Sequence, residues 1–390
     1  MSNLPRQQLS LIGAVAIGVA SMLGAGVFIV FREAFALAGE WLWLSLLLAG
    51  LVAALNSASI LQLARQVDRP GGVYAYASVY LNDKVAKTAG FAFVIGKIAS
   101  IAAIGLVFGA YVLPGYQQAI AITLIAVLAL INILGIQRTA TVAMILASIT
   151  VLFLALTIAT GLIHGQELPP ATVSAGKDFE PQIVTAAAIF FFAFAGYARV
   201  ATLGNEVRNA RVNIPLAIAI SLLLVLALYG GLAVVLSPVL ASSVASNQLP
   251  FLVFFSEIGL TFEGVTVVVA AIASAGSMLA LLAGVSRTAA EMGADEALPP
   301  SLANRNKFGS PWVAELAVAG LAALLVLAGP ISWVISLSSL GVLFYYAIGH
   351  LSALAQPVTE RMFPRLVSWF GLLMSLILAS SAGVMFAAGL

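Results

Sequence analysis

The stretch from Ser21 to Phe28 offers chemistry through its backbone rather than its side chains. It reads Ser-Met-Leu-Gly-Ala-Gly-Val-Phe, within an apolar run from about Leu9 to Phe31 that is long enough to cross a bilayer. Gly24 and Gly26 each weaken a helix by about 1 kcal/mol relative to alanine. Where a helix breaks, its free N–H groups attract an anion and its free carbonyls attract a cation. The stretch therefore predicts a ligand site at a broken helix, or close helix packing through small residues.

A second interruption is expected between Phe190 and Arg199, where Gly196 follows a run of phenylalanines. Gly24 and Gly196 each lie about 20 Å into their apolar runs, near the middle of a bilayer. The two runs are expected to cross in opposite directions, with five spans separating their starts. Two antiparallel broken helices at this spacing are typical of an inverted repeat in a transporter. The pairing favours the ligand-site interpretation over simple packing.

Lys97 is the third residue of interest, because it lies about 15 Å into a predicted span. A charge there is unfavourable by about 2.5–3.5 kcal/mol on insertion scales, so it usually faces a cavity or a partner. Gly96, Ala99 and Ser100 beside it favour a helix face turned inward. A lysine kept from water gives up its proton readily, so Lys97 could couple a proton to transport. Alternatively, it could pair with a substrate carboxylate or extend to the cytoplasmic interface.

Composition defines the class of protein. The chain has 390 residues, 62% hydrophobic and 8% charged, with a formal net charge of +2. A soluble domain carries about 25% charged residues, so this is a polytopic membrane protein. With no cysteine and only two histidines, His164 and His350, no metal site, cofactor or catalytic site is expected. No phosphate-binding loop of the Walker type is present, so direct use of ATP is not expected, and an intramembrane enzyme is disfavoured.

The apolar runs predict about eleven spans. Most lysines and arginines fall on one side if the N-terminus is cytoplasmic, with only Arg32 and Lys177 outside. The predicted units are a first repeat at 1–163, an extracellular connector at 164–182, a second repeat at 183–352 and an additional span at 353–390. The spans are expected at about 9–31, 41–63, 87–113, 116–134, 139–162, 183–203, 214–236, 262–285, 313–327, 331–350 and 366–388, with a partial helix at 249–256.

Several segments resemble, in order along the chain, motifs of the amino acid–polyamine–organocation permease superfamily. They are Gly24–Phe28, the loop Arg69–Tyr76, the aromatic segment Phe192–Tyr197, the loop Glu206–Pro215 and the loop Val285–Pro299. The resemblance implies a bacterial amino acid permease with the LeuT-like fold: all-α, an inverted five-plus-five repeat, broken helices 1 and 6, and here one additional C-terminal helix. This chain departs from the pattern at Ala210, where proline is common, and at Tyr197-Ala198-Arg199, where an acidic residue is common.

The expected site would bind a zwitterion at the two breaks. The substrate carboxylate would bind the amides of Gly24, Ala25 and Gly26, and the ammonium would face carbonyls near Ser21, Phe192 and Phe194. The resemblance assigns the same backbone segments to the substrate. Aromatic residues beside Gly196 would close over the ligand, unless they serve lipid-facing or core packing; they are Phe191, Phe194 and Tyr197.

Charged residues after the second break suggest a cytoplasmic gate. Arg199 and Glu206 could form and break ion pairs between states, with Glu291, Asp295 and Glu296 as partners. The alternative is a cluster of interfacial charges that only orients the chain.

Together these features predict a secondary transporter of neutral amino acids in the cell membrane, working by alternating access. The segments beside the breaks lack a carboxylate for a cationic side chain. A proton, in symport or exchange, is the expected coupling ion. In some relatives of the family that the chain resembles, a lysine replaces the sodium ion at the position where Thr150 stands here. The hydroxyls of Ser274 and Ser277 leave a sodium-coupled symporter open. An exporter of amines or amino acids and a non-transporting amino acid sensor also remain open. The expected partners are an amino acid, an ion and the lipid bilayer, without nucleic acid.

Overall fold

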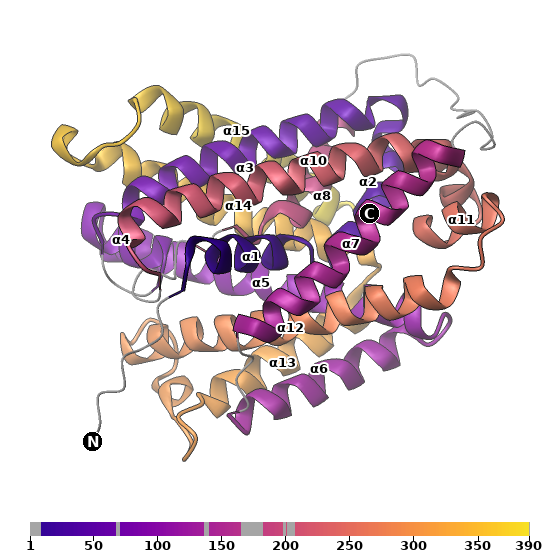
Figure 1. Ribbon diagram of the computed structural model, residues 1–390. Coiled ribbons are helices and arrows are strands. Elements are labelled where there is room, and N and C mark those ends of the chain that lie inside the picture. The colour runs from indigo at the N-terminus through magenta and orange to yellow at the C-terminus, as the bar shows by residue number, and fades with distance from the viewer. Residues whose placement is uncertain are drawn as a thin grey trace.

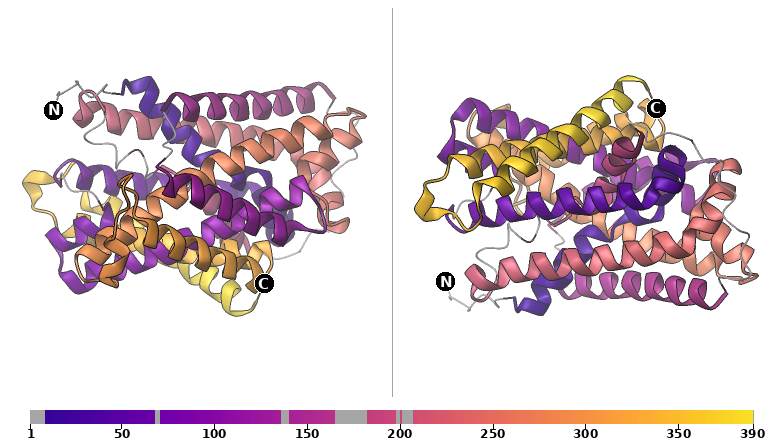
Figure 2. Two further views of the ribbon diagram at one scale, coloured as in Figure 1. Left: turned by 90° about the horizontal axis from the view of Figure 1, so that it is seen from below. Right: turned by 90° about the horizontal axis from the view of Figure 1, so that it is seen from above.

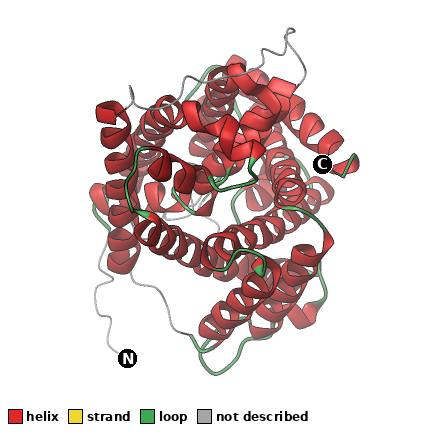
Figure 3. Cartoon of the chain, turned by 90° about the vertical axis from the view of Figure 1, so that its right-hand side faces the viewer, coloured by secondary structure: helices red, strands yellow, loops and turns green. Residues whose placement is uncertain are grey.

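The computed structural model describes residues 9–67, 71–135, 140–164, 182–197, 200 and 207–389. Within these ranges the chain is helical, as Figure 3 shows, and the only β-type pairing is an isolated bridge between Leu9 and Val207. An all-helical fold is therefore confirmed for the described residues.

The helices follow the apolar runs of the sequence, and two of them, α1 (Leu11–Met22) and α5 (Asp83–Val112), begin at polar caps. The Ser10 hydroxyl accepts a hydrogen bond from the Gly13 amide at 3.2 Å, and Asn82 Oδ1 accepts one from the Val85 amide at 3.0 Å. The α-helices are α1 (Leu11–Met22), α2 (Val30–Ala38), α3 (Leu42–Ala64), α4 (Val73–Tyr80), α5 (Asp83–Val112), α6 (Gln117–Ile133), α7 (Ala140–His164), α8 (Gln182–Phe194), α10 (Ala210–Ala245), α11 (Pro250–Glu257), α12 (Glu263–Ala294), α13 (Trp312–Ala328), α14 (Ile331–Ala355) and α15 (Arg365–Ala387). Short 3₁₀ turns are η1 (Ala25–Phe28), η2 (Gly39–Trp41), η3 (Pro300–Ala303) and η4 (Val358–Glu360).

Seven helical segments of the described chain are long and apolar enough to cross a membrane. Four shorter apolar helices, α1, α6, α8 and α13, accompany them. Each of the predicted spans overlaps one of these helices. The partial helix predicted at 249–256 is α11. The chain is thus a multi-pass membrane protein.

Two elements differ from the sequence prediction. The predicted span 214–236 is part of α10, a helix of 36 residues that contains Pro215 and Pro238. The loop expected after α3 contains the helix α4, which starts after Gly71 and Gly72, both with positive φ. The Val73 amide of α4 donates to the Tyr345 hydroxyl of α14 at 2.8 Å. The Tyr345 hydroxyl is thus an acceptor for a free amide in the first turn of α4. A sequence pattern does not reveal such a contact between distant helices.

The helix α5 lies in the interior of the bundle and packs against α14, α6 and α12. In Figure 1, α6, α12 and α13 lie together at the bottom, whereas α3 and α10 run side by side near the top. The C-terminal helix α15, yellow in Figure 2, lies along α14 and also contacts α3 and α8. This arrangement brings α1 and α8, far apart in sequence, into the middle.

Gly109 on α5 is a position where the backbone of α6 approaches closely. A Cβ atom there would lie 2.7 Å from Gln117 Cα, so a side chain would force the two helices apart. We expect Gly109→Ala to destabilise the protein by about 1–3 kcal/mol, seen as a lower melting temperature in detergent. The control is Gly320→Ala on α13, where nothing lies within 4 Å of the added atom. Equal melting temperatures for the two variants would contradict this packing.

Candidate functional site

The first helix is interrupted where the glycines predict it. The helix α1 ends at Met22, and Gly24 is extended with φ −79° and ψ −156°. The 3₁₀ turn η1 then separates α1 from α2. The residues from Met22 to Phe31 are all buried. Among the described residues, the amides of Gly24, Ala25 and Gly26 have no acceptor. Buried amides without a partner are rare in proteins, and at the start of a helical turn they suit an anion.

The second interruption contacts the first directly. The helix α8 ends at Phe194 and continues as a turn through Ala195 to Tyr197. A Cβ atom on Gly196 would overlap the Ser21 carbonyl oxygen, and one on Gly26 would lie 3.2 Å from Ala193 Cα. At Gly196 only glycine permits this approach of two backbones, whereas at Gly26 a side chain would be tightly packed against its neighbours. The structure therefore brings Ser21, Gly26 and Gly196 together.

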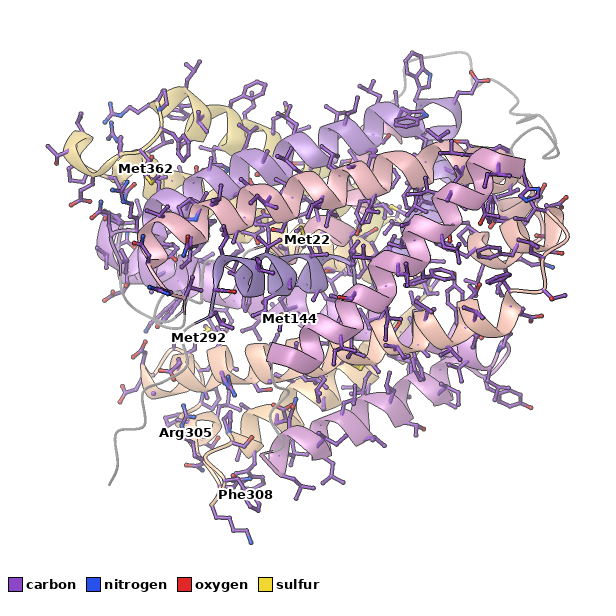
Figure 4. The ribbon with its side chains drawn as sticks, viewed as in Figure 1. Met22, Met144, Met292, Arg305, Phe308 and Met362 are labelled. Atoms are coloured by element: carbon purple, nitrogen blue, oxygen red, sulfur yellow. The ribbon has the colours of Figure 1, made fainter. Side chains whose placement is uncertain are left out.

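Tyr229 on α10 joins the two interruptions and was missed by the sequence analysis. Its hydroxyl lies 3.2 Å from the Met22 carbonyl at the end of α1 and 3.2 Å from the Ala193 carbonyl of α8. The single hydroxyl proton is shared between these two acceptors. Figure 4 labels Met22 in the middle of the bundle. A tyrosine within an otherwise apolar span is the signal that could have identified it, because a buried hydroxyl needs a partner.

Lys97 also reaches the second interruption. Its Nζ donates to the Ala195 carbonyl at 3.1 Å, and the side chain is only 8% exposed. It therefore lies in the interior rather than extending to the interface. Because a helix carries partial negative charge at its C-terminal end, an ammonium is favoured at this end of α8.

The aromatic residues predicted beside Gly196 are fully buried, so lipid-facing packing is excluded for them. The Phe194 ring contacts Tyr229 with centroids 5.0 Å apart. The rings of Phe191 and Tyr197 both contact Tyr346 of α14, at 6.1 and 5.3 Å. In this conformation they are packed within the core beside the two interruptions.

A small cavity of about 10 Å³ lies next to the first interruption, between α1, α7 and α12, with Leu23, Thr150 and Ser277 among its lining residues. Its volume is close to the minimum for one water molecule. The hydroxyls of Thr150, Ser274 and Ser277 each donate to a carbonyl of their own helix. Their lone pairs remain able to accept a hydrogen bond or to bind a cation.

The predicted cytoplasmic gate is only partly described. Arg199 and Glu206 lie outside the described residues. Of their predicted partners, Glu291 forms an ion pair with Arg305 at 3.3 Å, and Asp295 accepts a hydrogen bond from the Tyr74 hydroxyl at 2.8 Å. Partial burial and this bond to a carboxylate raise the pKa of Tyr74 to about 12. The loop after α12 is thereby connected to α4.

The fold and these contacts define a class: a multi-pass membrane protein with two interrupted helices that meet inside the bundle. The model of the amino acid permease family matches residues 9–390. The chain therefore belongs to the amino acid permease family, within the superfamily that its motifs resemble.

Its relatives include proteins named as transporters. The chain is 38% identical to an uncharacterized transporter of Mycobacterium tuberculosis, over 96% of this chain and 86% of the relative. It is 25% identical to cationic amino acid transporter 5 of Arabidopsis thaliana, over 87% of this chain and 63% of the relative. These similarities indicate a transporter rather than an enzyme.

Removing the hydroxyl that joins the interruptions should destabilise the fold. Tyr229→Phe leaves the buried carbonyls of Met22 and Ala193 without this donor, a loss of about 1–3 kcal/mol. We expect a lower melting temperature in detergent. Tyr116→Phe, at a tyrosine 67% exposed before α6, is the control and should melt like the unaltered protein. If Tyr229→Phe melted like the control, the shared hydrogen bond would not stabilise the site.

Proposed function

We propose that the protein is a secondary transporter of neutral amino acids that works by alternating access. The observation that carries the proposal is the set of three consecutive buried amides, at Gly24, Ala25 and Gly26, without an acceptor among the described residues. A substrate carboxylate would satisfy them. The permease family and the transporter names of the relatives support the general class.

The second half of the proposed site would bind the ammonium group. The turn after α8 presents carbonyls at its C-terminal end, where a cation is favoured. The Ser21 carbonyl contacts the same turn at Gly196. Phe191, Phe194 and Tyr197 would open and close over the ligand as α8 moves. The distance between the two charges of an α-amino acid is short, which suits two interruptions in direct contact.

An inverted repeat would explain how such a site opens to each side in turn. We propose repeats at 1–163 and 183–352, joined by an extracellular connector at 164–182 and followed by an additional span at 353–390. The N-terminus would lie in the cytoplasm of a cell whose plasma or inner membrane holds the protein. The distribution of lysine and arginine supports this orientation.

A neutral side chain is favoured by the residues around the interruptions. The stretches from Ser21 to Phe28 and from Phe190 to Tyr197 contain no aspartate or glutamate. Their phenylalanines favour apolar, bulky side chains. The Arabidopsis relatives are named for cationic amino acids, and that name makes arginine the main competitor.

Lys97 provides a route for coupling to protons. Its ammonium occupies the Ala195 carbonyl at the end of α8 that the substrate ammonium would also use. A substrate arriving at this end would favour the neutral lysine, because two cations would otherwise compete for one set of carbonyls. Proton release from Lys97 would then accompany substrate binding.

Sodium coupling is the second candidate, favoured by the cavity beside Leu23. Hydroxyl oxygens of Thr150 and Ser277 line it together with small residues of α1 and α12. Hard cations take oxygen ligands. Uptake that requires sodium at constant pH, and that Thr150→Val removes, would favour this alternative over a proton.

The substrate class is tested by thermal shift of the purified protein against the neutral amino acids, arginine and matched amines without a carboxylate, at pH 5 to 8. We expect leucine-like amino acids to raise the melting temperature and the matched amines not to do so, because the amides at the first interruption need an anion. Stabilisation only by amines would contradict the proposed site. Uptake into proteoliposomes then separates a transporter from a sensor of the same fold, and the direction of net movement identifies an exporter.

The coupling role is tested with two variants of Lys97 in proteoliposomes under a proton gradient. We expect Lys97→Ala to lose the pH dependence of uptake and to accumulate substrate only to equilibrium. Lys97→Arg keeps the charge but cannot release the proton, so substrate binding should weaken and accumulation should fail. Lys84→Ala, at an exposed position on the same helix α5, is the control. Unchanged pH dependence in Lys97→Ala would contradict proton coupling, and full activity of Lys97→Arg would instead favour a pair with the substrate carboxylate.

A further inference from the structure

Two buried polar groups beside the second interruption lack hydrogen bonds, and they are neighbours. The hydroxyl of Tyr197 and Nδ2 of Asn56, on α3, have no partner among the described residues. The Asn56 amide lies beside the Tyr197 hydroxyl, which also lies beside Tyr346. Both side chains are almost fully buried. Unpaired groups of this kind are unfavourable in an apolar interior, so two of them side by side require an explanation.

The orientation of Asn56 is fixed from its other end. Its Oδ1 accepts a hydrogen bond from the Ser375 hydroxyl of α15 at 2.8 Å and lies 2.7 Å from His350 Nε2 of α14. Because Oδ1 can only accept, Nε2 of His350 carries the proton in this arrangement. Its Nδ1 then accepts from the Ser59 hydroxyl at 2.8 Å.

The chain of donors therefore has one direction. Ser59 uses its proton on His350, so its contact with the Ser368 hydroxyl at 3.1 Å is donated by Ser368. Donation runs from Ser368 through Ser59 and His350 to Asn56 Oδ1. The amide hydrogens of Asn56 have no acceptor among the described residues, and the Tyr197 hydroxyl is a neighbouring group that can accept one of them.

We propose that Asn56, oriented by His350, is a positioning residue that donates to the Tyr197 hydroxyl and so sets the tyrosine ring at the end of α8. This inference rests on the proposed function, in which Tyr197 closes over the substrate. It also gives α15 a role, because Ser368 and Ser375 anchor the network from outside the two proposed repeats.

The bond itself is tested without any substrate. Protein labelled with ¹³C at the tyrosine Cζ is reconstituted in nanodiscs, and the Tyr197 resonance is assigned from its loss in Tyr197→Phe. We expect Asn56→Leu to shift this resonance, because the phenol oxygen loses its donor. Ser57→Ala is the matched control, because Ser57 is buried on the same helix and its hydroxyl donates to the Ala53 carbonyl of its own helix. An unshifted Tyr197 resonance in Asn56→Leu would overturn the proposal even if the protein transports nothing.

The consequence for binding is tested by a double-mutant cycle. The probe is leucine or arginine, whichever of the two the unaltered protein binds. We expect Asn56→Leu and Tyr197→Phe each to raise KM about tenfold, the effect of one buried hydrogen bond, with little change in kcat. The double variant should be no worse than Tyr197→Phe, because Asn56 acts through that hydroxyl. Losses that multiply in the double variant would overturn the proposal.

Variants of His350 test the orientation of the amide and guard against misfolding of Asn56→Leu. We expect His350→Gln to retain the Tyr197 resonance and the KM, since a glutamine amide can donate to Asn56 Oδ1. His350→Leu should reproduce Asn56→Leu in both measurements. Equal behaviour of the two His350 variants would overturn the orienting role. Failure of the unaltered protein to bind any amino acid would count against the proposed function alone.

Discussion

The requirement that buried backbone groups find partners dominates this structure. In a bilayer, neither lipid nor neighbouring apolar side chains can replace a helical hydrogen bond. The chain nevertheless interrupts two helices in its interior, between Met22 and Val30 and after Phe194. These interruptions contact each other through Gly26 and Gly196, and at Gly196 the contact excludes any larger residue. The surrounding helices supply donors for the freed carbonyls.

Those donors come from two other helices and are of two chemical kinds, phenol hydroxyls and an ammonium group. Tyr229 of α10 serves Met22 and Ala193, Lys97 of α5 serves Ala195, and Tyr111 of α5 serves Phe28 at 2.9 Å. The carbonyls of the interruptions are thus largely paired within the protein. The three amides from Gly24 to Gly26 have no acceptor among the described residues. This asymmetry, with carbonyls satisfied and amides free, is why an anionic group is the stronger half of the proposed recognition.

Hydrogen bonds between buried polar groups also extend outward from the two interruptions. On the far side of Tyr197, the network of Asn56, His350 and Ser375 connects α3, α14 and α15. Buried networks of this kind fix one arrangement of a core, because each member is oriented by the next. A transporter must change the packing around its site without losing these partners, so side chains that can exchange one bond for another are suited to the boundary between moving parts.

The sequence alone indicated the membrane class, the approximate positions of the apolar spans and the glycines at which the helices could break. It could do so because apolar length and glycine placement act locally along the chain. It also identified Lys97, because a charge within an apolar span needs a partner. It did not reveal that Tyr229 bonds to the carbonyls of Met22 and Ala193 or that Asn56 contacts His350, and it treated α4 as a loop. Their roles depend on which carbonyl or amide lies opposite, and only the tertiary packing of helices distant in sequence decides that.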